Sequence, residues 1–159
     1  MNIFYLHPDP VVAAQLHCDK HVVKMILESA QILCAVHNRH NSWQDFMYKP
    51  AYVKHPSVLW AGDSAPNYVW LWHLAMALCA EYTARYGKIH TTQALLAKLQ
   101  APPPMLADNG ISEPPQCMPD ECKSDSAIDA YRTYYKHKRS IISMKWNRSD
   151  NAPTFMESV

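Results

Sequence analysis

An all-α fold is predicted by three features of this 159-residue sequence. Long stretches carry apolar residues at helical spacing. No stretch longer than a few residues shows the two-residue alternation of a strand. Serine or aspartate precedes several of the helical stretches, at the position of an N-cap. The length is that of one domain, so we expect residues 1–159 to form a single compact helical bundle with one long proline-rich loop.

The first expected helices lie before residue 41. Asp9 and Pro10 form a typical helix start, with aspartate as N-cap and proline in the first turn. The helix over residues 11–17 either continues into the next one or breaks near Asp19. The second helix includes residues 16–31 and continues to an end between residues 37 and 41. Residues 41–56 form an aromatic connector that we expect to pack on the core or against a ligand.

A long helix over residues 64–86 is expected at the centre of the core. Ser64 is its expected N-cap and Gly87 closes it. Between residues 68 and 80 it is apolar nearly all round, which is typical of a helix surrounded by protein, so His73 is expected to be buried and hydrogen-bonded. Shorter helices are expected over residues 57–60, 91–100 and 126–144. The six prolines of residues 101–125 favour a functional loop that wraps over a site.

One face of the helix over residues 16–31 is polar. At 100° per residue, one stripe about 100° wide holds six polar side chains: His17, Lys20, His21, Lys24, Glu28 and Gln31. The other positions, Val23 and Leu27 among them, are apolar, so we expect protein to cover most of this helix. The mixture of acid, base and cation favours the floor of an active site. The alternative interpretation is a solvated face.

The stripe favours amine chemistry over a metal site. Two ammonium groups one turn apart weaken each other's hold on a proton, so Lys20 or Lys24 is the expected nucleophile or base. Glu28 is the expected general base, and His17 or His21 the proton shuttle. Two histidines at i, i+4 are also typical of a metal site, but the adjacent lysines disfavour a divalent ion, so we predict no metal and no cofactor. The alternative is a Lys24–Glu28 salt bridge along the helix.

The segment of residues 131–148 holds six of the fifteen basic residues and no acidic one. Three tyrosines and a tryptophan lie among them. Basic groups contact phosphates and aromatic faces stack on bases, so nucleic acid or another polyanion is predicted as a partner, against the alternative of a solvated cationic face. The candidate nucleic-acid-binding residues are Arg132, Lys136, Lys138, Arg139, Lys145 and Arg148. A net charge of +1 excludes a molecule that attracts nucleic acid over its whole surface.

Cysteine usage and hydropathy favour a cytoplasmic protein without a membrane partner. The five cysteines are an odd number, and no secretory signal precedes them. Cys117 and Cys122 lack the CxxC spacing of a zinc knuckle. No apolar run is long enough to cross a membrane.

Several motifs resemble those of the phage pyrimidine-dimer DNA glycosylases. They are the early polar helix, the segment HPSVLW that begins at His55, and the segment EYTARYG that ends at Gly87. The chain also resembles small phage-encoded proteins that open with MNIF and contain CDKHVVKM and PPQCMPD. The resemblance implies an all-α enzyme of the phage-infected bacterial cytoplasm, which flips a pyrimidine out of duplex DNA and attacks the sugar C1′ with an amine.

The resemblance also implies roles for particular residues. Glu28 is the candidate acid, and the other charged residues of the stripe form the polar wall. The candidate substrate-binding residues are Gln31, His55, Asn67, Glu81 and Arg85. In these glycosylases the attacking amine belongs to a threonine exposed by removal of methionine. Here the bulky Asn2 follows Met1 and disfavours that removal, so we expect Lys20 or Lys24 to replace the N-terminus.

Two alternative functions stay open, and the target base and the oligomeric state are not predicted. One alternative is a transferase that joins an amino acid or another amine to activated 5-hydroxymethyluracil in phage DNA. Its lysines would bind the leaving phosphate, and Glu28 or a histidine would deprotonate the incoming amine. The other alternative is a non-enzymatic module that binds DNA or protein through the polar helix.

Overall fold

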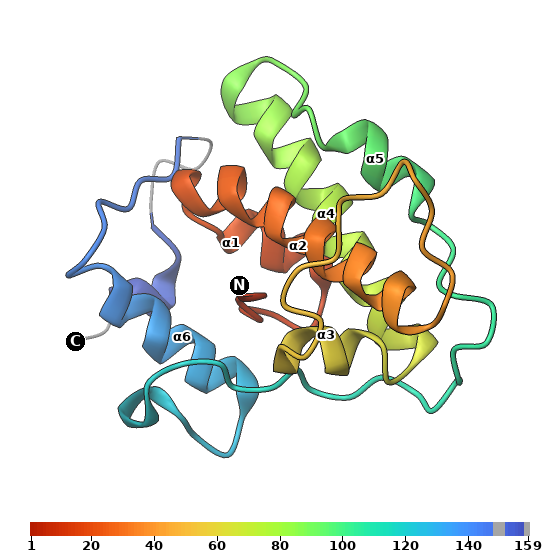
Figure 1. Cartoon of the computed structure of the whole chain (residues 1–159). Helices are drawn as coiled ribbons and strands as arrows, with labels where there is room; N and C mark the ends of the chain where they lie inside the picture. The colour runs from red at the N-terminus through yellow and green to blue at the C-terminus, as the bar shows by residue number, and fades with distance from the viewer. Residues whose placement is uncertain (148–151, 158–159) are drawn as a thin grey trace.

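The computed structural model describes residues 1–147 and 152–157, and these residues contain six α-helices, two short 3-10 turns and no strand. The all-α prediction is therefore confirmed (Figure 1). The elements are α1 (Pro10–Leu16), α2 (Asp19–Arg39), α3 (Pro56–Ala61), α4 (Ala65–Tyr86), α5 (Gln93–Lys98), η1 (Asp120–Cys122), α6 (Ala127–Lys138) and η2 (Thr154–Met156).

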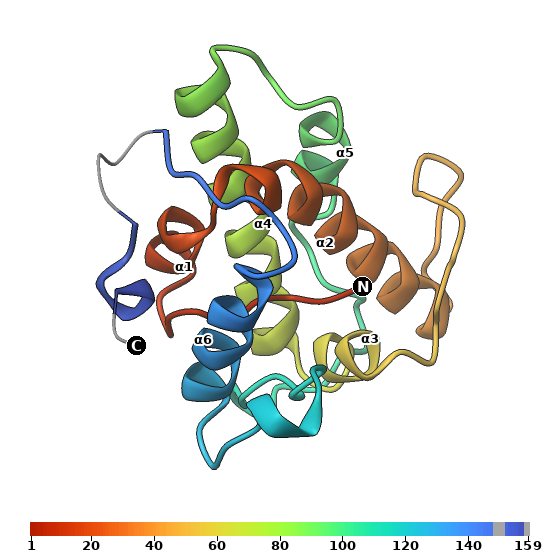
Figure 2. The same cartoon turned by 90° about the vertical axis from the view of Figure 1, so that its left-hand side faces the viewer.

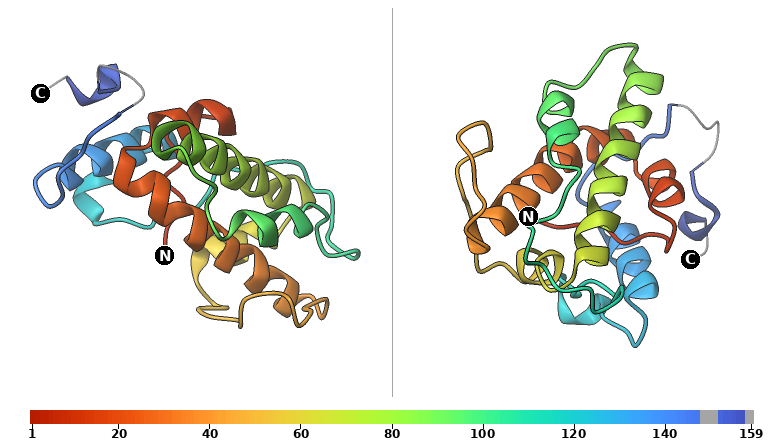
Figure 3. Two further views of the ribbon diagram at one scale, coloured as in Figure 1. Left: turned by 90° about the horizontal axis from the view of Figure 1, so that it is seen from above. Right: turned by 90° about the vertical axis from the view of Figure 1, so that its right-hand side faces the viewer.

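Helix α4 packs against α1 and α2, and these contacts form the centre of the core (Figure 3). Leu71, Leu74 and Leu78 of α4 are fully buried there. The prediction that α4 is covered all round is wrong, because His73 and Ala80 lie on an exposed stripe. An alanine side chain is small enough to be exposed to solvent at little cost. A helix face without charged residues therefore does not have to be buried.

The chain breaks between α1 and α2, which decides between the two predicted alternatives. Asp9 caps α1 as predicted, and its Oδ1 accepts hydrogen bonds from the backbone N–H groups of Val11 and Val12 at 2.8 and 3.3 Å. His17 and Cys18 are extended, with ψ angles of 135° and 159°. Helix α2 then begins at Asp19 and runs in a new direction (Figure 1).

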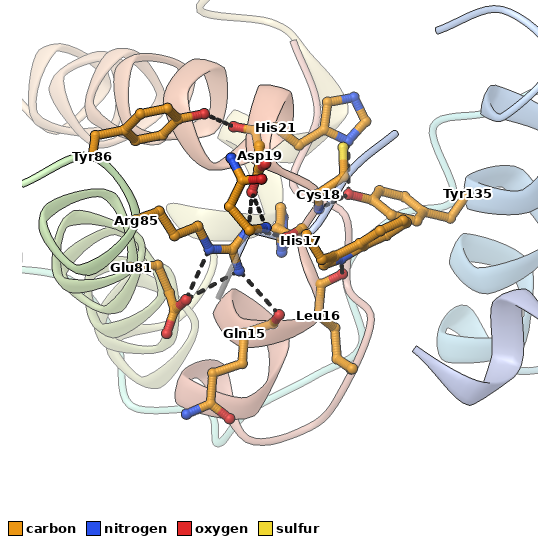
Figure 4. A network of polar contacts seen from close by, with 12 residues as sticks. Gln15, Leu16, His17, Cys18, Asp19, His21, Glu81, Arg85, Tyr86 and Tyr135 are labelled. Atoms are coloured by element: carbon orange, nitrogen blue, oxygen red, sulfur yellow. Dashed lines mark hydrogen bonds and ion pairs between the residues drawn. The ribbon is translucent and has the colours of Figure 1, made fainter. Parts of the chain in front are cut away.

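Arg85 at the end of α4 holds this break in place (Figure 4). Its guanidinium donates to the backbone oxygens of His17 at 2.8 Å and Gln15 at 3.2 Å. It also forms ion pairs with Asp19 and Glu81, each at 3.0 Å. All three charged side chains are less than a tenth exposed. The last carbonyls of α1, which have no partner inside the helix, are satisfied in this way.

The C-terminal part of the chain packs on the same break. The Tyr135 hydroxyl of α6 accepts a hydrogen bond from the Cys18 N–H at 2.7 Å. The Trp146 indole donates to the Leu16 oxygen at 3.0 Å, and Asp19 N–H donates to the Lys145 oxygen at 2.8 Å. The predicted helix over residues 126–144 ends early, at Lys138, because the following residues turn back over this break.

The proline-rich loop is fastened to the start of α4 by Asn67. The buried Asn67 amide donates to the Trp60 oxygen and the Ser112 hydroxyl, and its Oδ1 accepts from the Ser112 N–H. Further along, the Tyr131 hydroxyl donates to the Pro115 oxygen at 2.6 Å. The loop is therefore held on both sides, and it brings Cys117 against the N-terminal segment.

Residues 1–147 and 152–157 contain neither a membrane-spanning helix nor a cluster of metal ligands. None of the helices there combines the length and the apolar character needed to cross a membrane. No group of three or more histidine, cysteine, aspartate or glutamate side chains in this part of the chain is arranged to hold a metal ion.

We predict that replacing Arg85 by methionine strongly destabilises the fold. The substitution leaves two buried carboxylates without their cation, a change that costs about 3–5 kcal/mol when a buried pair is broken. Urea unfolding followed by circular dichroism measures the loss. The matched control is Lys123→Met, which removes an exposed ion pair to Asp120 of 2.7 Å. No measurable loss is expected there, and equal losses in the two variants would contradict this account.

Candidate functional site

A pocket of about 230 Å³ lies where the polar face of α2 meets the N-terminal segment. Three predicted residues of α2 line it: His21, Lys24 and Glu28. Met25, also of α2, lines it as well. The other lining residues come from the N-terminal segment, the turn before α3, the proline-rich loop and α6: Met1, Asn2, Phe4, His55, Cys117, Tyr134 and Lys138. Figure 2 shows the N-terminus beside α2 and α3, with α6 covering the segment that leads to it.

Two amines share the carboxylate of Glu28. The α-amine nitrogen of Met1 lies 3.9 Å from Oε2, and Nζ of Lys24 lies 3.3 Å from Oε1. The side chains of Met1 and Glu28 are only 3% and 12% exposed, whereas that of Lys24 is 69% exposed. The carboxylate and the α-amine are therefore held by protein, and the lysine reaches in from solvent.

Asn2 fixes the N-terminal segment between two walls of the pocket. Its backbone N–H donates to Oε2 of Glu28 at 3.0 Å, and its side-chain amide donates to the Cys117 oxygen at 2.8 Å. Its Oδ1 accepts from the Ile3 N–H at 2.8 Å. These three bonds use both the backbone and the side chain of Asn2, so the position of the α-amine is determined by α2 and the loop together.

His21 forms a neutral part of the pocket wall. Its ring stacks on Phe4, with centroids 4.5 Å apart, and its Nδ1 lies 3.0 Å from the Tyr135 hydroxyl. Burial, with smaller effects from His17, Lys138 and Lys24, lowers the pKa of His21 to about 3. The imidazole is therefore uncharged at neutral pH, which does not fit the predicted role of proton shuttle.

Phe4 shapes this wall through an unusual backbone conformation. Its φ angle is 56°, in the left-handed region that bulky residues rarely adopt. The ring stacks between His21 and Tyr134, whose centroid is 5.9 Å away. Strained conformations of this kind persist only where the surrounding structure imposes them.

His17 and Lys20 do not line the pocket. His17 is fully buried in the break between α1 and α2, and its Nδ1 lies 2.6 Å from the Ala13 oxygen. Burial is the largest of the effects that lower the pKa of His17 to about 4. Lys20 is exposed and lines a second hollow of about 210 Å³ with Lys145.

The predicted substrate-binding residues are scattered. His55 lines the pocket and caps α3, where its Nδ1 accepts from the Ser57 N–H at 3.1 Å. Burial, and then the N-terminal ammonium group, lowers the pKa of His55. The others lie elsewhere: Glu81 and Arg85 belong to the buried ion network, Asn67 fastens the loop, and Gln31 is half-buried outside the pocket lining.

The predicted basic segment is also divided. Lys138 lines the pocket, with its Nζ 5.1 Å from the Tyr134 ring centroid. Arg132 donates to the Leu6 oxygen at 3.0 Å, and Arg139 donates to the Met156 oxygen at 3.3 Å. Lys136 is half-buried, Lys145 lines the second hollow, and Arg148 lies outside the described residues.

A larger hollow, of about 560 Å³, lies elsewhere, between the connector of residues 41–56 and the start of the proline-rich loop. Phe46, His37 and Lys98 line it together with Met47 and two prolines, and no acidic side chain is present. Size alone favours this hollow, but the smaller pocket has the paired amines and carboxylate that acid–base and nucleophilic chemistry need.

Six residues that line the pocket were not predicted from the sequence: Met1, Asn2, Phe4, Met25, Cys117 and Tyr134. They become neighbours only through contacts such as that between Asn2 and Cys117, which are 115 residues apart. The one indication that the N-terminus belongs to the site was the resemblance to a family whose N-terminal amine reacts.

The pocket of this helical protein thus brings two amines and a carboxylate together, which are groups that covalent amine chemistry uses. Comparison with known proteins then gives the family. A family model described as pyrimidine dimer DNA glycosylase matches residues 1–94, more than half of the chain. The chain therefore belongs to this family, which indicates a DNA glycosylase-like function on pyrimidines with DNA as partner. No curated protein and no solved structure matches the chain.

We predict that acid destabilises the protein through His17 and His21. The reference pKa of histidine is 6.5, and those of the folded residues are about 4 and about 3. Between pH 6.5 and 4 the unfolded chain therefore binds protons that the folded chain does not, and stability falls as the pH falls, by up to about 1.4 kcal/mol per unit for each histidine.

Urea unfolding at a series of pH values tests this account. His21→Gln is expected to reduce the slope of the unfolding free energy against pH by the contribution of one histidine. A slope identical to that of the wild type would contradict the assignment of His21.

Proposed function

We propose that the protein is a base-excision glycosylase and lyase that acts on a pyrimidine flipped out of duplex DNA. The observation that carries the proposal is the α-amine of Met1, which lies 3.9 Å from Glu28 inside the pocket. A nucleophilic amine beside a carboxylate is the arrangement that amine attack at a sugar carbon requires. Membership of the pyrimidine dimer DNA glycosylase family supports the choice of substrate.

We assign the nucleophile to the α-amine of Met1 rather than to a lysine. The buried Met1 side chain and the hydrogen bonds of Asn2 fix the position of this α-amine beside Glu28. Lys24 is mostly exposed, which suits a cation that attracts a phosphate.

The reaction follows from these positions. The neutral α-amine attacks C1′, and the glycosidic bond breaks with its electron pair going to the pyrimidine. Glu28 takes a proton from the attacking nitrogen and passes it to the departing base. The nitrogen lone pair then opens the sugar ring at O4′, which takes up a proton from solvent. The product is a protonated Schiff base between Met1 and C1′.

Other pocket residues fit the binding of a nucleotide. A volume of about 230 Å³ is below the roughly 300 Å³ of sites that enclose a drug-sized ligand, so only part of a nucleotide would be enclosed. The half-buried Tyr134 offers an aromatic side chain to a base, and Lys24 and Lys138 offer cations to the adjoining phosphates.

We predict a covalent adduct on DNA that contains a pyrimidine dimer. Borohydride reduces the Schiff base to a stable amine, and the adduct then migrates as a protein–DNA conjugate on a denaturing gel. Trypsin releases residues 1–20 as one peptide, so mass spectrometry should find the sugar remnant on Met1. Undamaged duplex is the control. The absence of both adduct and base loss on dimer DNA would remove the proposal.

We expect Glu28→Gln to slow adduct formation at least about 100-fold, because an amide can no longer move the proton. The matched control is Glu121→Gln, which makes the same change at an exposed position of η1. Single-turnover adduct formation is the measurement. Comparable rates for Glu28→Gln and wild type would show that the carboxylate takes no part.

We expect a chain extended by glycine and serine before Met1 to lose the adduct, because the reactive amine then lies outside the pocket. Lys24→Gln, by contrast, should still form an adduct that maps to residues 1–20. The reverse pattern, with the adduct kept by the extended chain and lost in Lys24→Gln, would assign the nucleophile to Lys24 instead.

A further inference from the structure

Two aliphatic side chains of α2 are exposed beside the pocket. Val23 is 37% and Leu27 is 40% exposed. The sequence predicted that protein covers both, and the structure corrects this. Met25 and Ile26, from the same helix, are buried. Solvent therefore reaches an apolar ridge, which we define as Val23 and Leu27, on a helix whose opposite side forms the core.

The ridge adjoins both the pocket and two cations. Leu27 directly precedes Glu28, whose carboxylate lies in the pocket, and Val23 directly precedes Lys24, which lines it. At 100° per residue, Val23, Leu27, Lys20 and Lys24 fall within about 100° of the helix circumference. Lys20 and Lys24 are both exposed. The ridge is thus an apolar strip with positive charge along one side and the pocket beyond that charge.

We propose that Leu27, supported by Val23, enters the base stack of DNA at the gap left when the target nucleotide moves into the pocket. This inference rests on the proposed function, because it needs a nucleotide in the pocket. Moving a base out of a duplex breaks its stacking, and an inserted apolar side chain fills the space. The neighbouring lysines are placed to hold the phosphates on either side of the gap.

The chemistry of the ridge suits DNA better than a protein partner. The ridge is narrow, since it consists of two side chains, and on α2 it has the exposed cations Lys20 and Lys24 along one side. A phosphate backbone is the partner that complements a cation-flanked strip of this kind. Its position next to the pocket means that a strand entering the pocket passes over it.

The test uses a DNA duplex that can be bound but cannot react. A duplex with one tetrahydrofuran residue, a stable abasic analogue, has a gap in its stack and no reactive C1′. Dissociation constants of the full chain for this duplex and for the intact duplex give a preference ratio. The variants are Leu27→Ala, Leu27→Met, which keeps the aliphatic length, and Met105→Ala. Met105 is 89% exposed in the proline-rich loop, so it is a matched control outside the site.

The expected result is that wild type prefers the duplex with the gap and that Leu27→Ala reduces this preference about tenfold, the approximate effect of burying one leucine side chain. Leu27→Met should restore the preference, and Met105→Ala should keep it. Circular dichroism melting confirms that each variant is folded.

Three results would overturn the inference: no preference in the wild type, a preference unchanged in Leu27→Ala, or an equal loss of affinity for both duplexes. If Leu27→Ala leaves the preference unchanged, the ridge would instead be assigned to contact with a second copy of the chain or with another protein. The borohydride experiment separates the two proposals. A Leu27-dependent preference without any adduct supports the DNA contact and removes the excision chemistry, whereas an adduct without that preference removes only the contact.

Discussion

The buried guanidinium of Arg85 is the interaction on which the rest of the structure depends. It joins the end of α4 to the break between α1 and α2, through two backbone oxygens and two carboxylates. The direction of α2 is set at that break. Because α2 carries Lys24 and Glu28, this buried network determines where the carboxylate of Glu28 points. The C-terminal segment packs on the same break through Tyr135 and Trp146.

The candidate site is built from parts that are distant in sequence, and each part has a separate physical reason for its place. Glu28 is positioned by the core packing of α2. The N-terminus is positioned by hydrogen bonds of Asn2 to Glu28 and Cys117. The aromatic wall depends on the stacking of Phe4 between His21 and Tyr134. The neutral state of His21 follows from the same burial that creates the wall.

The sequence predicted the parts of the fold that depend on local patterns. The helical period located α2 and α4, and Asp9 and Gly87 mark the start of α1 and the end of α4, since each acts within one turn. Ser64 precedes α4 as predicted, but its hydroxyl donates to the Gly110 oxygen instead of capping the helix. The roles of the polar residues were predicted less accurately. The sequence does not distinguish a charged side chain in a buried ion network from one that lines a pocket. Arg85 and Glu81 were expected to bind substrate, and they lie instead in the core.

Which face of α2 is exposed depends on which faces the other helices cover. The spacing of apolar residues in the sequence does not specify this. For that reason Leu27 was expected to be buried. The place of the N-terminus likewise depends on a contact spanning 115 residues.

The far wall of the pocket has a consequence for the newly made chain. Cys117, Tyr134 and Lys138 follow the 94 residues that match the family, and the N-terminal amine is the first group to be synthesised. During translation that amine therefore emerges long before the cavity that orients it. A ribosome-bound intermediate ending before α6 would carry this nitrogen on an open surface, so the pocket is complete only after α6 has been made.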